Sequence, residues 1–175
     1  MLHSKGLGPR DPPATGSHQS QQRQVRRRLQ RRIPRRPAPR LAKVIALDAS
    51  VLVAHLYPFD THHDAATSIL LGAADEPLLV HSLTMAEVLV GGVKIGKGIE
   101  MRADLQTAGI LIASPDDDEP LRVAELRATT GLKLPDCCVL DAARTNDARL
   151  ATFDRTLATA ARRLDVVAMP LMKAR

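Results

Sequence analysis

From residue 43 onward, short apolar runs alternate with segments whose apolar residues recur at helical spacing. Short continuous apolar runs are typical of strands buried on both faces of a sheet. These runs predict strands over 44–47, 78–81, 110–113 and 149–152, and a shorter one over 166–168. The helical spacing predicts helices over 50–56, 63–74, 85–90, 99–108, 119–130, 136–144 and 155–164. Strands separated by helices predict a parallel sheet with helices on both faces.

Glycines and prolines indicate where several of these helices end. Pro58 follows the first helix, and Gly131 closes the one that begins at Glu119. The pair Gly91-Gly92 is expected to end the helix that begins near Met85. With Gly96 and Gly98, this pair predicts a mobile surface loop that carries Lys94 and Lys97. An alternative role for this loop is contact with a phosphate backbone.

The first 42 residues differ in composition from the rest of the chain. Residues 1–43 hold twelve Lys and Arg against one acid, whereas residues 44–175 hold thirteen against eighteen. The leader has six prolines and few apolar residues, so we expect residues 1–42 to be disordered and residues 43–175 to form one domain. The leader is either a basic arm for phosphate backbones or a segment without a role, with translation beginning near Val44.

The apolar runs and the cysteines bear on location. The longest apolar runs are far too short to span a membrane, and no apolar segment follows the basic N-terminal residues as in a secretory signal. Cys137 and Cys138 are neighbours in sequence, which disfavours a disulfide between them. We therefore expect buried thiols in a reducing compartment and a cytoplasmic protein.

Four acidic residues follow the predicted strands toward one edge of the sheet. Asp48 comes directly after the first strand, Glu87 lies in the helix after the second, Asp136 opens a helix, and Asp154 follows the fourth strand. Ligands of parallel sheets collect at the carboxyl ends of the strands. The sequence therefore predicts that these four carboxylates face one site.

Each acid also has a simpler explanation. Thr84 and Glu87 have the spacing of a capping box, and Asp48, Asp136 and Asp154 are ordinary residues for helix starts. Taken together, however, capping does not require acids to converge on one edge. Like charges in close proximity repel and raise one another's pKa, and a hard divalent cation relieves the repulsion. Mg²⁺ or Mn²⁺ suits such oxygen ligands and can assist phosphodiester hydrolysis.

Four short motifs carry a family resemblance: VIALDAS at 44–50, TMAEVLVG at 84–91, LPDCCVLDAA at 134–143 and ATFD at 151–154. In this order and spacing they resemble the PIN-domain family, and more closely the VapC-type toxins of bacterial toxin–antitoxin pairs. The resemblance covers about 44–168. It implies a three-layer α/β/α fold with a central, mainly parallel sheet of four to five strands.

The resemblance also implies an activity and partners. The activity is that of a Mg²⁺- or Mn²⁺-dependent endoribonuclease, usually a homodimer, held inactive by a VapB-type antitoxin. By position, Asp48 and Asp136 are the principal metal ligands, Glu87 helps to orient the attacking water, and Asp154 is the fourth acid. Ser50 and Thr152 match positions where the family often has a hydroxyl. Asp141 lies about 140° from Asp136 on a helix, so we expect it to face elsewhere and keep it as a secondary candidate.

Other polar clusters receive simpler interpretations. His62 and His63 are adjacent and cannot both face one ion from a helix, which favours surface or partner-facing roles. The acidic run 116–119 is expected to be a solvated helix start, not a second metal site. Aromatic residues are few, so we expect RNA choice to depend on shape and backbone and not on an aromatic platform.

Two other function classes remain open. The domain could be catalytically silent and act only through binding an antitoxin, or the chain could bind RNA mainly through its arginine-rich leader. An acidic pocket also predicts that an antitoxin inserts Arg or Lys between the carboxylates.

Overall fold

The computed structural model describes residues 44–169; the expectations for residues 1–42 lie outside this part of the chain. Strands and helices alternate along it much as the hydrophobic pattern predicts. The elements are β1 (Ile45–Leu47), α2 (Ala49–Leu56), α3 (His63–Gly72), β2 (Leu78–Val80), α4 (Ser82–Lys94), α5 (Gly98–Thr107), β3 (Ile110–Ile112), α6 (Glu119–Thr130), α7 (Leu134–Thr145), β4 (Arg149–Ala151) and α8 (Arg155–Arg163).

The four strands form one parallel sheet in the order β3-β2-β1-β4. In register, Ala46 of β1 pairs with Leu79 on one side and with Leu150 on the other. The segment predicted as a fifth strand adds a single parallel bridge, between Leu150 and Ala168. The prediction of a mainly parallel sheet of four to five strands is confirmed.

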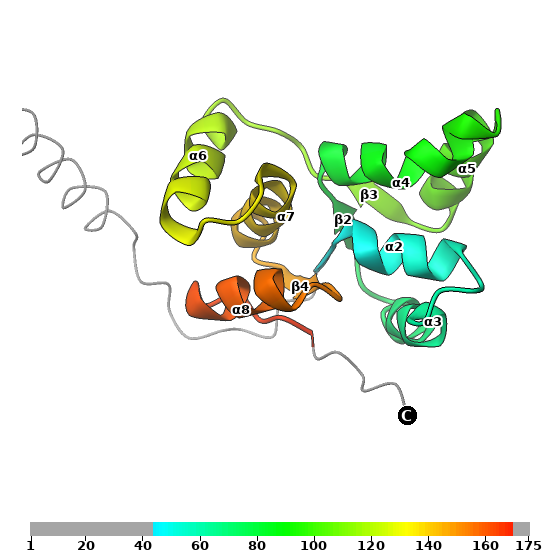
Figure 1. Ribbon diagram of the computed structural model, residues 1–175, viewed down its shortest axis with the longest axis horizontal. Coiled ribbons are helices and arrows are strands. Elements are labelled where there is room, and N and C mark those ends of the chain that lie inside the picture. Colours follow the sequence, from blue (N-terminus) through cyan, green and yellow to red (C-terminus); the bar gives the residue numbers. More distant parts are fainter. Residues whose placement is uncertain (1–43, 170–175) are drawn as a thin grey trace, which may run out of the picture. The chain divides into compact units, whose positions relative to one another are not determined.

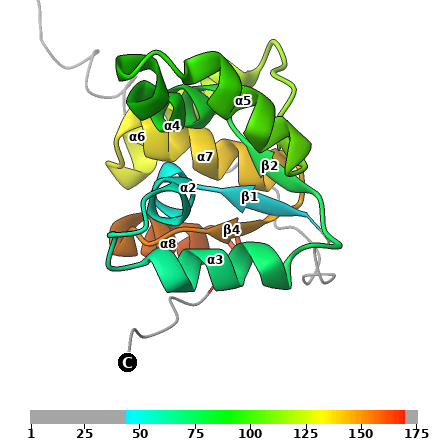
Figure 2. The ribbon, with the colours of Figure 1, turned by 90° about the vertical axis from the view of Figure 1, so that its right-hand side faces the viewer.

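Helices cover both faces of the sheet, as Figure 1 shows with α6, α7 and α8 on one side and α2 to α5 on the other. The alternation of side chains along β1 divides the core. Ala46 packs into the cluster made with α6, α7 and α8, while Ile45 and Leu47 pack into the cluster made with α2 to α5. Turned by 90°, Figure 2 shows α3 running alongside β1 and β4. The predicted three-layer α/β/α architecture is therefore confirmed.

The prediction that a helix ends at Gly91-Gly92 is wrong. Helix α4 continues through both glycines to Lys94, so the predicted loop shrinks to residues 95–97, with Gly96 at a φ of +75°. A Cβ on Gly92 would lie 3.0 Å from the Met101 sulfur and 3.4 Å from the Gly98 Cα. Gly92 therefore permits close packing of α4 against α5, and this packing outweighs the low helix propensity of glycine.

The strand order places a crevice at one edge of the sheet. From β1 the chain moves outward to β2 and β3, and then returns to add β4 on the opposite side of β1. The loops after β1 and β4 consequently lead to opposite faces, and such a switch point is where parallel sheets bind ligands. No helix within residues 44–169 is long and apolar enough to cross a membrane.

Candidate active site

Asp48 follows β1 and is 9% exposed, and two hydroxyl groups hold it. The Ser50 Oγ donates to Asp48 Oδ2 at 2.5 Å, and the Thr152 Oγ1 donates to the same oxygen at 2.8 Å. Asp48 occupies the N-cap position of α2 but makes no side-chain capping bond. Its carboxylate is therefore tied to the end of β4 and does not serve as a helix cap.

The same hydroxyls also accept backbone hydrogen bonds from the loop after β4. Ser50 Oγ accepts from the Phe153 N–H at 3.1 Å, and Thr152 Oγ1 accepts from the Asp154 N–H at 2.9 Å. Ser50 and Thr152 thus join the two loops that flank the crevice. Within residues 44–169, no hydrogen bond reaches the other Asp48 oxygen, Oδ1, which remains available to a ligand.

Glu87 is exposed in the second turn of α4 and does not take part in a capping box. The helix begins earlier than predicted, at Ser82, and His81 caps it by accepting the Leu83 N–H on Nδ1 at 3.0 Å. Partial burial raises the pKa of Glu87, and the charges of Asp48 and Asp136 raise it further. Glu87 therefore lies within electrostatic reach of two other predicted site residues.

Asp136 is half-buried in the first turn of α7. Desolvation raises its pKa, and the charges of Asp154 and Asp48 add to this effect, while the backbone amide and the charge of Lys133 oppose it. Asp136 is thus the one carboxylate whose pKa responds to both Asp48 and Asp154.

Asp154 performs the capping role that was the simpler explanation for it. Its Oδ1 accepts the backbone N–H groups of Thr156 at 2.6 Å and Leu157 at 2.8 Å at the start of α8. Capping uses only this oxygen, and the charge of Asp154 still raises the pKa of Asp136. A capping role and a place beside the other carboxylates are therefore compatible.

The four carboxylates share one electrostatic neighbourhood. Each of them raises the pKa of another member or has its own raised by one, and no described ion pair involves any of the four. Among the side chains of residues 44–169, no three His, Cys, Asp or Glu are grouped so that they could hold a metal ion as they stand. The arrangement is therefore an acidic crevice without a basic counterpart, not a closed metal cage.

Asp141 is separated from this crevice by its own partner. It is 3% exposed and receives the Arg122 Nε at 2.9 Å, and Arg122 also binds both oxygens of Asp116. The expectation that Asp141 faces elsewhere agrees with this arrangement. The acidic run is a helix start, but it is not simply solvated, because Asp116 is tied to Arg122 and Glu119 to His81.

The His81–Glu119 pair escaped the sequence reasoning. His81 Nε2 lies 2.9 Å from the Glu119 Oε1, and its Nδ1 caps the helix that carries Glu87. Because Nδ1 accepts a hydrogen bond, the neutral ring carries its proton on Nε2 and donates it to Glu119. Only a histidine directly after a predicted strand could have pointed to this link, which spans 38 residues in sequence.

The remaining predicted histidines and cysteines have structural surroundings. His62 is exposed, whereas His63 is half-buried with its Nδ1 3.0 Å from the Ala54 carbonyl. Cys137 and Cys138 are free and buried, and burial raises the pKa of the Cys138 thiol to about 11. Both thiols therefore act as small apolar groups of α7.

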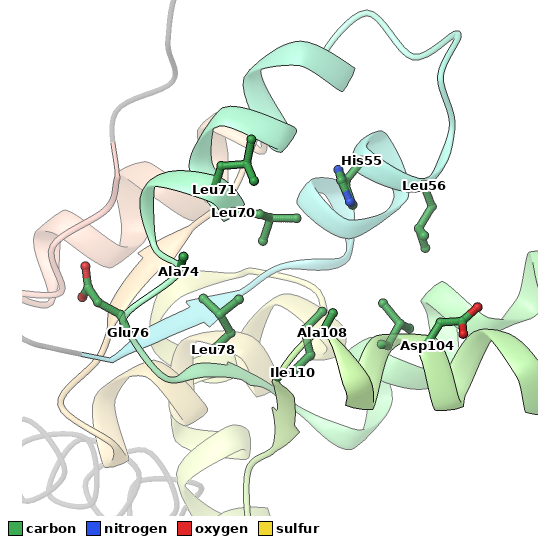
Figure 3. A pocket seen from close by; sticks show the side chains of 12 residues that line it. His55, Leu56, Leu70, Leu71, Ala74, Glu76, Leu78, Asp104, Ala108 and Ile110 are labelled. Atoms are coloured by element: carbon green, nitrogen blue, oxygen red, sulfur yellow. The ribbon is translucent and has the colours of Figure 1, made fainter.

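A separate cavity of about 470 Å³ lies at the other ends of the strands. Figure 3 shows its apolar lining, with Leu56 from α2, Leu70 and Leu71 from α3, and Leu78 and Ile110 at the starts of β2 and β3. His55, Glu76 and Asp104 are the polar residues in its wall. None of the four predicted acids lines this cavity.

Comparison with known proteins assigns the fold to a family. The family model described as the PIN domain matches residues 45–163, most of the chain. The chain belongs to the PIN domain family. The predicted family membership is thereby confirmed, and the matched region spans all four acidic positions.

Solved PIN-like structures resemble the chain as well. A toxin–antitoxin complex from Klebsiella pneumoniae matches with 26% identity and a TM-score of 0.52, over 63% of this chain and 86% of that one. FitAcB from Neisseria gonorrhoeae has the same fold, with 18% identity and a TM-score of 0.57, over 74% of this chain and 99% of that one. No protein with a curated function matches the sequence. The likeness to a toxin–antitoxin complex agrees with the expected VapC-type toxin.

Proposed function

We propose that this PIN domain is a metal-dependent endoribonuclease and the toxin of a type II toxin–antitoxin pair. One observation carries the proposal: Asp48, Glu87, Asp136 and Asp154 raise one another's pKa in a crevice where no described basic side chain pairs with them. An enzyme that stabilises charge on a phosphodiester needs a cation there, and these carboxylates are the oxygen ligands that attract one.

The donor set fits Mg²⁺ or Mn²⁺. Mg²⁺ is commonly held by one or two carboxylates, with water and substrate phosphate oxygens completing its octahedral shell. Asp48, with Oδ1 unbonded among the described residues, and Asp136 would hold the ion, and Glu87 and Asp154 would take part directly or through water. When bound, the ion supplies Lewis-acid stabilisation of the phosphodiester charge and lowers the pKa of water.

The protein's own side chains have distinct roles in this proposal. Ser50 and Thr152 fix the orientation of the Asp48 carboxylate from two different loops. Glu87 is exposed, and its raised pKa makes it a better proton acceptor at neutral pH, so it would orient the attacking water and receive its proton. Asp154 keeps Oδ2 for the site while Oδ1 caps α8.

The partners follow from the same charges. RNA is the proposed substrate, and a VapB-type antitoxin the proposed inhibitor, which would insert Arg or Lys between the carboxylates. A homodimer is proposed by analogy with the family. The two buried free thiols fit a reducing compartment, and we place the protein in the cytoplasm.

RNA cleavage by site variants tests the proposal. Purified chain is incubated with total RNA plus Mn²⁺ or Mg²⁺, or with EDTA, and cleavage ends are mapped. Asp48→Ala and Asp136→Asn should abolish cleavage without loss of the folded state, whereas Asp104→Asn, an exposed acid on α5, serves as the matched control.

Wild-type cleavage rates in either site variant would overturn the assignment. A folded chain that binds an antitoxin but neither Mn²⁺ nor RNA would instead be a silent PIN domain. Loss of RNA binding on deletion of residues 1–42, with cleavage also lost, would favour the leader as the RNA-binding element.

A further inference from the structure

An aromatic stack lies beside the acidic crevice. The rings of His62 and Phe153 are nearly parallel, with their centroids 4.5 Å apart and their planes 19° apart. Phe153 stands between Thr152, which holds Asp48, and Asp154. His62 precedes α3, so two segments far apart in sequence build this stack at the carboxyl edge of the sheet.

Both rings are held in place by bonds to their own backbones. The Phe153 N–H donates to Ser50 Oγ at 3.1 Å, and the Phe153 ring packs against the core cluster of α2 to α5. The His62 N–H donates to Asp60 Oδ1 at 2.7 Å. Phe153 is half-buried and His62 is exposed, so one face of the imidazole rests on Phe153 and the opposite face is open to solvent.

We infer that the open face of His62, backed by Phe153, is a stacking subsite for one nucleobase of the RNA strand. Bases stack on His and Phe side chains, and single-stranded RNA is commonly bound in this way. A base stacked there would belong to a nucleotide close to the carboxylates, because Ser50 Oγ bonds both the Phe153 amide and Asp48. The inference rests on the proposed nuclease function and revises the expectation that no aromatic platform contributes.

A second aromatic pair in the same loop provides a matched control. Tyr57 and Phe59 pack edge to face, with centroids 5.7 Å apart, and Phe59 is 85% exposed. No described hydrogen bond within residues 44–169 links Phe59 to a residue of the crevice. If exposed aromatic area alone binds RNA, Phe59 should matter more than His62.

Fluorescence with the full chain tests the subsite without requiring cleavage. The probe is a pool of short single-stranded RNAs with 2-aminopurine at one fixed position, moved along the strand in successive pools, in EDTA. Wild-type protein should quench 2-aminopurine at one position relative to the rest. His62→Ala should abolish this quenching and weaken RNA binding roughly tenfold, the range for losing one stacked base. His62→Tyr should restore both, and Phe59→Ala should change neither.

The outcomes separate this inference from the proposed function. RNA binding and quenching that are unchanged in His62→Ala, or that fall equally in Phe59→Ala, overturn the stacking subsite and leave the nuclease proposal standing. Wild-type protein that binds no RNA overturns both. Thermal melts of each variant show whether a loss of binding reflects unfolding, and His62→Tyr gives a second, independent readout if His62→Ala is unstable.

Discussion

Helix α7 carries two aspartates five residues apart, and their surroundings are opposite. Asp141 is almost fully buried, and the Arg122 guanidinium neutralises it. Asp136 is half-buried without a described ion pair, and desolvation, Asp154 and Asp48 raise its pKa. The same residue type thus serves the fold at one position and is left electrostatically unsatisfied at the other.

This contrast distinguishes structural acids from candidate catalytic ones. Asp116, Glu119, Glu76 and Asp141 all pair with Arg or His, and these pairs link α6, α7 and neighbouring segments. The four acids of the crevice have hydroxyls, amides or one another as neighbours. Unpaired, mutually repelling carboxylates cost stability, and proteins keep such groups where function requires them.

The largest expected effect concerns Glu87 and Glu119. Glu87→Gln should lower RNA cleavage by about a hundredfold or more, because proton transfer by a positioned side chain contributes at least that much. Glu119→Gln can still accept from His81 Nε2 and should cleave within a few-fold of wild type. Single-turnover cleavage rates at saturating Mn²⁺ check both. Equal losses in the two variants would remove the distinction between them.

Arg122→Ala should be the most destabilising change among the paired acids. It leaves the Asp141 carboxylate buried without its cation, which costs about 3 kcal/mol of unfolding free energy. Asp136→Asn should cost little or nothing by the same measure. Urea denaturation monitored by circular dichroism compares the two. A stable Arg122→Ala variant would mean that Asp141 does not depend on this ion pair.

His81→Ala should lower the unfolding free energy by about 1 kcal/mol, the usual cost of losing a helix N-cap. His81→Asn keeps a capping acceptor and should recover most of this loss. Because α4 carries Glu87, cleavage should fall in His81→Ala and recover in His81→Asn. Recovery of stability without recovery of cleavage would show that the bond to Glu119, not the cap, positions Glu87.

The smallest effect is the pH dependence of Asp136→Asn stability in EDTA. Since the pKa of Asp136 is raised in the folded state, folding favours its protonated form, and wild-type stability falls as pH rises through the folded pKa. Asn removes this penalty, so at pH 7 the variant should melt about 1–3 °C higher than wild type. Below the ordinary carboxyl pKa of about 4 the difference should vanish. A variant that melts lower at pH 7 would contradict the assigned cause.

Local chemistry made much of the fold predictable. The apolar runs located all four strands, and α6 has the predicted bounds because an acidic start and Gly131 mark its two ends. The course of α4 could not be predicted, because the reason for Gly92 is a contact with Met101 on another helix. Local signals mark where helices can end, but tertiary packing decides whether they do.

The candidate site was predictable only in part for the same reason. The order of the strands explains why Asp48 and Asp154 come to one crevice, and the motifs named all four acids. The partners of Asp48 are separated from one another by about a hundred residues of sequence, and the distinction between Asp136 and Asp141 depends on Arg122 from another helix. Such long-range pairings follow from the packed structure and not from local spacing.

Calorimetric titration with Mn²⁺ tests the central claim most directly, because it asks whether the unpaired acids attract a cation and the paired ones do not. The account predicts saturable Mn²⁺ binding by the wild-type chain, loss of that binding in Asp136→Asn, and wild-type binding in Asp116→Asn, whose carboxylate pairs with Arg122. The wild-type chain failing to bind Mn²⁺, or Asp136→Asn binding it as tightly as wild type, would contradict the account.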